Sequence, residues 1–133
     1  MARDGLGEIQ FNHRDPVYLQ VVRHFKELIA TGRLEAGETI PSRRELGALM
    51  KINPNTAQRA YKEMEEQRLI VTEGNSASRI TTDESILRSV RSELIEAEVE
   101  AFVASIRRID VPLSELVQWI ERKYEEAARG DEE

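Results

Sequence analysis

Residues 41–61 read PSRRELGALMKINPNTAQRAY, and the two helix starts within them indicate the fold class. Ser42 stands three residues before Glu45, which is the spacing of a capping box at a helix N-terminus. Asn53 and Pro54 mark a second helix start, because an amide side chain caps a helix and proline suits its first position. Two short helices separated by a tight turn predict a helix-turn-helix.

An amphipathic helix precedes this motif, and a β-hairpin follows it. Apolar residues recur at intervals of three and four from Tyr18 to Ile29, which predicts a helix that starts with Asp15 as its cap and stops at Gly32. Residues 69–73 and 78–81 predict two strands joined by a turn. A hairpin directly after the second helix of the motif predicts a winged helix-turn-helix.

Two long helices are predicted beyond Asp83, separated near Pro112. The first carries two apolar seams, and a two-helix hairpin of this size has too little surface to shield both from water. Pairing with an identical hairpin across a two-fold axis covers them, and packing against the chain's own first domain is the alternative. The predicted dimer interface comprises Leu87, Val90, Leu94, Phe102, Ile106 and Ile120.

Charge is unevenly distributed along the 133 residues. The net charge is −6, of which residues 1–82 carry +1 and residues 83–133 carry −7. We therefore expect two domains with different tasks: a winged helix-turn-helix DNA-binding domain over 1–82 and a helical hairpin for dimerisation over 83–133. The predicted fold class is mainly α with a small β-hairpin.

Several classes of protein are excluded by composition. The absence of cysteine removes disulfides, thiolate metal sites and cysteine nucleophiles. Neither a signal peptide nor an apolar run of roughly 18 residues is present, so a cytoplasmic protein without membrane contact is expected. His13-Arg14-Asp15 matches a kinase catalytic loop only by chance, since Gln20 replaces the required Asn and no glycine-rich loop exists. No catalytic residue, metal or cofactor is expected.

The start of the second motif helix carries polar side chains that suit base edges. A recognition helix in the major groove presents its N-terminal, outward side chains to DNA. Asn55 and Gln58 can pair bidentately with adenine and Arg59 with guanine, while Thr56 can contact a phosphate or a thymine methyl. Four basic residues are expected near the phosphate backbone: Arg43, Arg44, Lys51 and Lys62. The wing adds Gly74 and Arg79 to the candidate DNA-binding residues.

The stretch from Pro16 to Ile80 resembles the DNA-binding domain of GntR-family transcription regulators. With the short two-helix tail, it is most similar to the YtrA-like branch. This resemblance implies a homodimeric bacterial regulator, usually a repressor, on a palindromic operator. It also implies DNA contacts for Arg44, Asn55, Thr56 and Gln58. The matching pieces are Pro16-Val17-Tyr18, Gly32-Arg33-Leu34, Gly37, Ile40–Leu46, Asn53–Tyr61 and Leu69-Ile70.

The wing departs from the family pattern, which reads Gly-x-Gly-Thr-aromatic-Val with basic residues around it. This chain has Glu73 at the start of the turn and Arg79 as the single compensating cation. Phosphates would repel Glu73, so this wing is not expected to enter the minor groove as the family's wings do.

A second class of function stays open from the residues alone. The acidic wing residue and the net charge of −6 also suit a helical protein-interaction module with little DNA affinity. A small-molecule effector between the C-terminal helices is a further open alternative, although about 50 residues after the wing do not enclose the large cavity of bigger effector domains.

Overall fold

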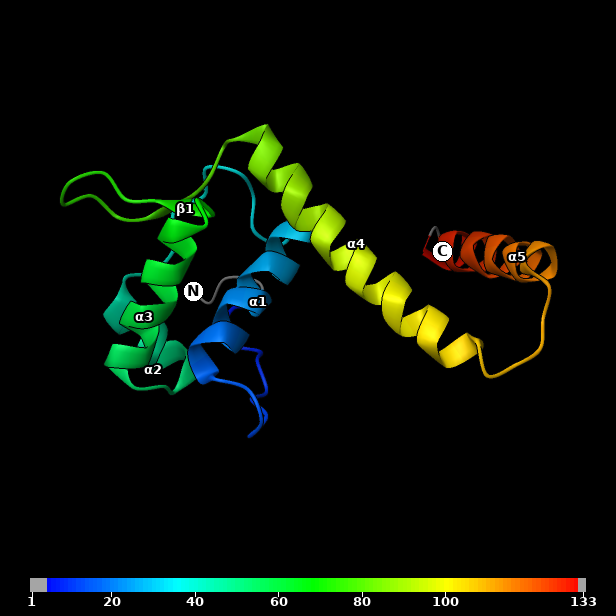
Figure 1. The fold of residues 1–133 in the computed structure, drawn as a ribbon. Helices are drawn as coiled ribbons and strands as arrows, with labels where there is room; N and C mark the ends of the chain where they lie inside the picture. The colour runs from blue at the N-terminus through cyan, green and yellow to red at the C-terminus, as the bar shows by residue number, and fades with distance from the viewer. Residues whose placement is uncertain (1–4, 132–133) are drawn as a thin grey trace. The chain divides into compact units, whose positions relative to one another are not determined.

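The computed structural model describes residues 5–131, which form five helices and a two-stranded antiparallel sheet (Figure 1). The chain divides into two compact units, one ending at Glu96 and the other beginning at Ala97, so that the division falls within α4. The predicted fold class is confirmed. The elements are α1 (Val17–Ala30), α2 (Arg43–Met50), α3 (Pro54–Glu66), β1 (Ile70–Val71), β2 (Arg79–Ile80), α4 (Glu84–Ile106) and α5 (Leu113–Asp131).

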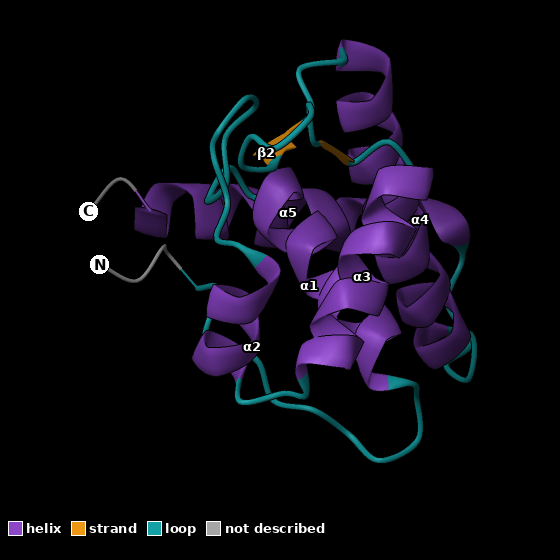
Figure 2. Ribbon diagram, turned by 90° about the vertical axis from the view of Figure 1, so that its left-hand side faces the viewer, coloured by secondary structure: helices purple, strands orange, loops and turns teal. Residues whose placement is uncertain are grey.

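The core of the first unit lies between α1, α2 and α3, which pack together in Figures 1 and 2. Phe25 of α1 and Tyr61 of α3 meet edge to face, with ring centroids 6.3 Å apart. The predicted anchors Leu34 and Ile40 are buried in the connection that follows α1. Burial of these side chains holds α3 with one face inward and the opposite face in solvent.

Both predicted helix starts in the motif are confirmed. Ser42 accepts a hydrogen bond from the amide of Glu45 at 3.1 Å, and the Glu45 carboxylate accepts one from the amide of Ser42 at 2.9 Å. Asn53 caps α3, since its side-chain oxygen accepts from the amide of Asn55 at 2.7 Å. Each of the two motif helices therefore begins at a cap made by local hydrogen bonds.

Gly47 allows the close approach of the two motif helices. A Cβ at this position would lie 3.3 Å from the carbonyl oxygen of Ile52 and 4.0 Å from the Cβ of Ala57. Lys51 ends α2 in the left-handed region with φ of 58°, which turns the chain sharply into α3.

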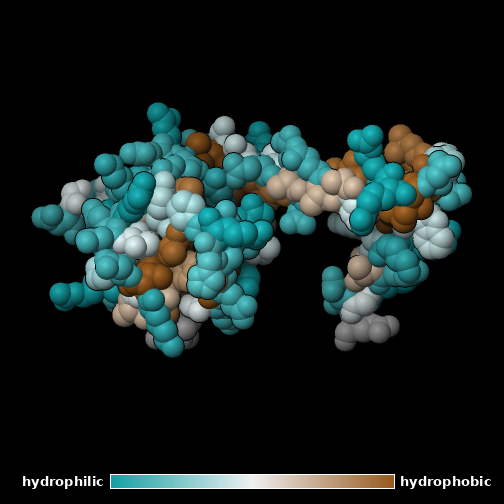
Figure 3. Space-filling model, turned by 60° about the horizontal axis from the view of Figure 1, so that its bottom comes forward, coloured by the Kyte–Doolittle hydropathy of each residue, from teal (hydrophilic) through white to brown (hydrophobic). Residues whose placement is uncertain are grey.

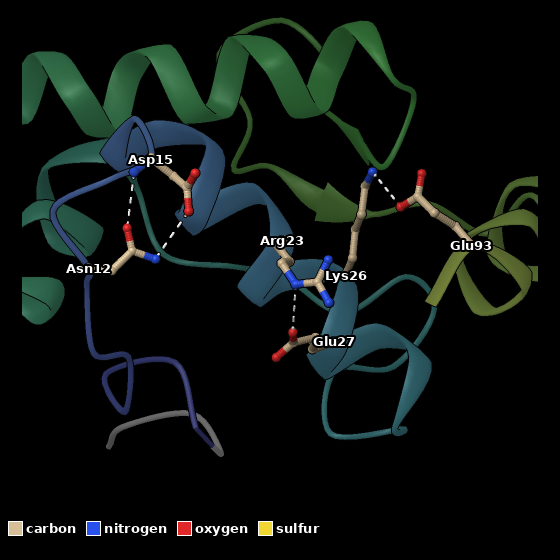
Figure 4. Close-up of polar contacts among 6 residues, drawn as sticks. All are labelled: Asn12, Asp15, Arg23, Lys26, Glu27 and Glu93. Carbon is tan, nitrogen blue, oxygen red and sulfur yellow. Dashed lines mark hydrogen bonds and ion pairs between the residues drawn. The ribbon is translucent and has the colours of Figure 1, made fainter. Parts of the chain in front are cut away.

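Asp15 was predicted to cap α1, and this prediction is wrong, because the cap position is the next residue, Pro16. Helix α1 follows Pro16, which provides no side-chain cap. The side-chain oxygen of Asn12 instead accepts from the amides of Arg14 and Asp15, and Asn12 Nδ2 donates to the Asp15 carboxylate at 3.1 Å (Figure 4). Asp15 is thus held by the preceding turn. The predicted stop at Gly32 is confirmed by its φ of +78° just after the helix.

The hairpin after α3 has the predicted position and is shorter than predicted. Ile70 pairs with Ile80 and Val71 with Arg79, and an isolated bridge joins Thr39 to Arg79 on the other edge of β2. The backbone of Arg79 is therefore held on both sides. The loop between β1 and β2 projects from the helices of this unit (Figure 1).

The first turns of α4 belong to the core of the first unit. Val90 is only 5% exposed, and Ile86 and Leu87 pack against the same core. Lys26 of α1 forms an ion pair with Glu93 of α4 at 2.8 Å (Figure 4). Packing against the chain's own first unit therefore accounts for this part of the apolar seam, and Val90 has almost no surface left for a second copy.

Candidate nucleic-acid interface

A stripe of exposed polar side chains runs along α3 on the face opposite the core. Asn55, Gln58, Arg59 and Lys62 are exposed, and their spacing of three, four and seven places them on one side of a helix. Thr56 is half-buried beside them. The buried side of the same helix consists of Ala57, Ala60, Tyr61 and Met64.

The charge on α3 changes along its length. Residues 54–62 include Arg59 and Lys62 and no carboxylate, whereas Glu63, Glu65 and Glu66 follow in the last turn. The N-terminal end also carries the positive end of the helix dipole, which favours an anion there. The end of α3 that the sequence predicts to meet DNA is thus the end that attracts phosphate.

The two arginines at the start of α2 lie in different surroundings. Arg43 forms an ion pair with Glu65 at 2.9 Å, and its guanidinium lies 5.0 Å from the ring centroid of Tyr61. Its Nε is buried and has no hydrogen-bond partner among the described residues. Arg43 therefore ties α2 to α3. Arg44 is exposed, and within residues 5–131 its side chain forms no hydrogen bond or ion pair.

Arg59 is placed by an aromatic residue of α1. Its guanidinium carbon lies 4.0 Å from the ring centroid of Tyr18, and Nη2 lies 3.5 Å from the Tyr18 hydroxyl. Arginine often stacks on an aromatic ring while its remaining N–H groups stay available. The contact of Tyr18 with Arg59 was not predictable from the sequence, because the spacing of Tyr18 in α1 indicates a core position.

The wing and the start of α2 border one groove of about 710 Å3. Its lining includes Ser42 and Arg43 on one side and Asn75–Ser78 on the other. At the base of the wing, Arg79 forms an ion pair with Glu73 at 2.8 Å. Gly74 has a φ of +57° and open space around its Cα, as the turn requires.

The structure thus gathers most of the predicted DNA-binding residues around the helix-turn-helix. Arg44 and Lys51 lie on α2 and at its end, and the polar stripe lies on α3. The Arg43 side chain instead pairs with Glu65 of α3, and the Arg79 side chain pairs with Glu73 in the wing. A helix-turn-helix with an exposed polar and basic second helix and a trailing hairpin defines a winged helix-turn-helix DNA-binding protein.

Comparison with known proteins gives the family. Residues 17–80 match the model described as "Bacterial regulatory proteins, gntR family". The transcriptional repressor YtrA of Bacillus subtilis is 30% identical over 106 residues, covering 79% of this chain and 82% of YtrA. The regulator YhcF of the same organism is 29% identical over 111 residues, covering 84% of this chain and 92% of YhcF. The chain belongs to the GntR family of DNA-binding transcription regulators and is not an enzyme.

Solved structures agree with this assignment. A GntR-family regulator from Listeria monocytogenes has a TM-score of 0.73 and 28% identity, covering 84% of this chain and 98% of that chain. A transcriptional regulator from Oenococcus oeni has a TM-score of 0.72 and 29% identity, covering 87% and 97%. Matches over 84% and 87% of this chain extend beyond the wing. No helix within residues 5–131 has the length and apolarity that crossing a membrane requires.

Proposed function

We propose that this regulator is a repressor that binds a palindromic operator as a homodimer. The observation that carries the proposal is the exposed polar stripe at the N-terminal end of α3, in a chain whose C-terminal helices expose apolar side chains. Repression is proposed because the related YtrA protein is named a transcriptional repressor.

Within this proposal the side chains divide into two groups. Asn55, Thr56 and Gln58 read base edges, because amides pair with adenine and a threonine methyl contacts thymine. Arg44 and Lys62 bind phosphates, which positions the protein without specifying a sequence. Lys51 adds a further phosphate contact at the turn. Arg59, held against Tyr18, contacts either a base or the backbone at the edge of the stripe.

A second copy of the chain is the partner that the C-terminal helices favour. Ten of the twelve exposed large hydrophobic residues in the described chain lie beyond position 94. No residue of α5 is buried, and Figure 3 shows hydrophobic side chains at the surface of this part. Exposed apolar surface of this extent marks an interaction site, and a two-fold axis brings two copies of one apolar seam together. Phe102, Ile106 and Ile120 are central to this interface.

The dimer sets the geometry of the operator. Two recognition helices enter successive major grooves when they are about 34–36 Å apart, or a multiple of that distance. The helices after the wing hold the two copies together, so their packing determines the half-site spacing. A change in that packing alters operator affinity without altering any residue that touches a base.

Titration of duplex DNA at several salt concentrations tests the proposal against the helical interaction module. A DNA-binding regulator releases counterions from each phosphate that it neutralises, so the logarithm of its affinity falls steeply with the logarithm of salt concentration. The proposal predicts tight, salt-sensitive binding to a palindrome selected from random DNA and weaker binding to a mixed sequence. Equally weak binding to both duplexes at every salt concentration would instead support the interaction module.

A further inference from the structure

The wing, residues 69–82, carries an ion pair at its base between two of its own residues. Arg79 Nη2 lies 2.8 Å from Oε1 of Glu73, and both side chains are exposed. The hydroxyls of Thr72 and Ser78 lie 2.5 Å apart across the same loop. Residues 69–82 contain one acidic residue, Glu73, and one basic residue, Arg79. The charges of the wing therefore cancel within the chain.

The position of Arg79 is fixed even though its side chain is in solvent. Its backbone pairs with Val71 on one side and bridges to Thr39 on the other. The loop that precedes it borders the same groove as Ser42 and Arg43 at the start of α2. The next residue, Arg44, is exposed and does not itself line this groove. A duplex that contacts Arg44 and the start of α3 therefore brings phosphates close to the wing.

We propose that Glu73 neutralises Arg79 and thereby limits the affinity of the wing for DNA of any sequence. Exposed ion pairs are weak and exchange readily, so Arg79 can leave Glu73 for a phosphate. The exchange leaves the Glu73 carboxylate uncompensated beside the anionic backbone, and the wing gains almost nothing. Glu73 is thus a specificity-determining residue, since contacts with phosphates raise affinity for all sequences equally. The inference rests on DNA binding through α3.

The test compares Glu73→Gln with the wild type on a mixed-sequence duplex of about 30 base pairs, by fluorescence anisotropy at several salt concentrations. Glutamine keeps the size of the side chain and removes its charge. Glu73→Gln is expected to bind this duplex more tightly, with a salt slope steeper by about 0.9 for one added phosphate contact. Between about 50 and 200 mM salt, its affinity should then fall roughly 3.5-fold further than that of the wild type.

Two further variants and a control complete the design. Arg79→Gln leaves Glu73 unpaired and should weaken binding, while the double variant should return to the wild-type affinity. Glu125→Gln removes one negative charge from an exposed position on α5 and should leave the salt slope unchanged. Thermal melts of each variant check that the fold is kept. Glu73→Ala repeats the anisotropy titration with a second uncharged side chain at position 73.

The outcomes separate the inference from the proposed function. If the wild type binds DNA and Glu73→Gln has the same affinity and salt slope, the role of Glu73 is wrong. The role is equally wrong if Glu125→Gln raises affinity as much as Glu73→Gln, because net charge alone then explains the effect. If the wild type binds no duplex, DNA binding itself fails.

Discussion

Arg43 and Arg44 show how neighbouring side chains of one type acquire different tasks. Arg43 reaches α3, where it pairs with Glu65 and lies over the ring of Tyr61. Arg44 is one helix position further, about 100° around the axis, and it stays in solvent. The first side chain stabilises the contact between the two motif helices, and the second is available to phosphate.

Alanine substitutions should separate these tasks. Arg43→Ala is expected to lower the free energy of unfolding by about 1–2 kcal/mol, because it removes a half-buried ion pair and a cation–π contact. Arg44→Ala should change stability by less than about 0.5 kcal/mol. It should weaken binding to every duplex and reduce the salt slope by about 1. Urea denaturation and DNA titration measure the two effects. A larger loss of stability in Arg44→Ala than in Arg43→Ala would reverse the assignment.

The sequence alone does not show that Arg43 contacts α3 while Arg44 stays exposed. Both follow a helix cap, and the partner of Arg43 lies 22 residues further along the chain, where only the packing of α2 on α3 brings it close. The contact of Arg59 with Tyr18 was not predictable either, because these residues are 41 positions apart in the chain. The exposure of Asn55 and Gln58 was easier to predict, because a recognition helix presents its outward N-terminal residues irrespective of distant partners.

At the scale of elements, local hydrogen bonds decide where the helices begin. The starts of α2 and α3 were predictable because the capping residues and their partners lie within three positions of each other. The start of α1 was not, since the side chain of Asn12 competes for the amide and carboxylate of Asp15. For α4, the apolar spacing was visible in the sequence, but it did not reveal that Val90 packs into the first unit.

The capping box predicts the effect of a change at Ser42. Ser42→Ala removes the acceptor for the amide of Glu45 and should destabilise the first unit by about 1 kcal/mol. For a domain of this size the melting temperature should fall by roughly 4–8 °C. Ser42→Asp is the matched control, because aspartate caps a helix as well as serine does. Equal melting temperatures for Ser42→Ala and the wild type would show that the cap does not hold α2.

In the molecule as a whole, the apolar residues after the wing are the surface on which we propose that two copies meet. The exposed seam on α4 includes Val99 and Phe102, at 52% and 41% exposed. Their burial against a second copy would contribute roughly 25 cal/mol for each Å2 of apolar surface removed from water. The proposed dimer would cover the same apolar surface that leaves α5 without buried residues.

Phe102→Glu should convert the proposed dimer into monomers, since burying an unpaired carboxylate in the interface costs several kcal/mol. Sedimentation equilibrium measures the mass directly. Gln118→Glu is the matched control, because it adds the same charge at an exposed position on the side of α5 away from Leu113 and Ile120, and it should remain dimeric. A dimer in the Phe102→Glu variant would place the interface elsewhere.

In the proposed dimer, the exposed N-terminal face of α3 reads DNA bases once in each copy. Selection of bound duplexes from a random pool tests it most directly, with the wild type and Asn55→Ala compared in parallel. The wild type should enrich two inverted half-sites with centres about 10 base pairs apart or a multiple of that. Asn55→Ala should lose its base preference at one symmetric pair of positions and keep it at the others. An enriched sequence without inverted repeats, or one that is identical for both proteins, would contradict the claim.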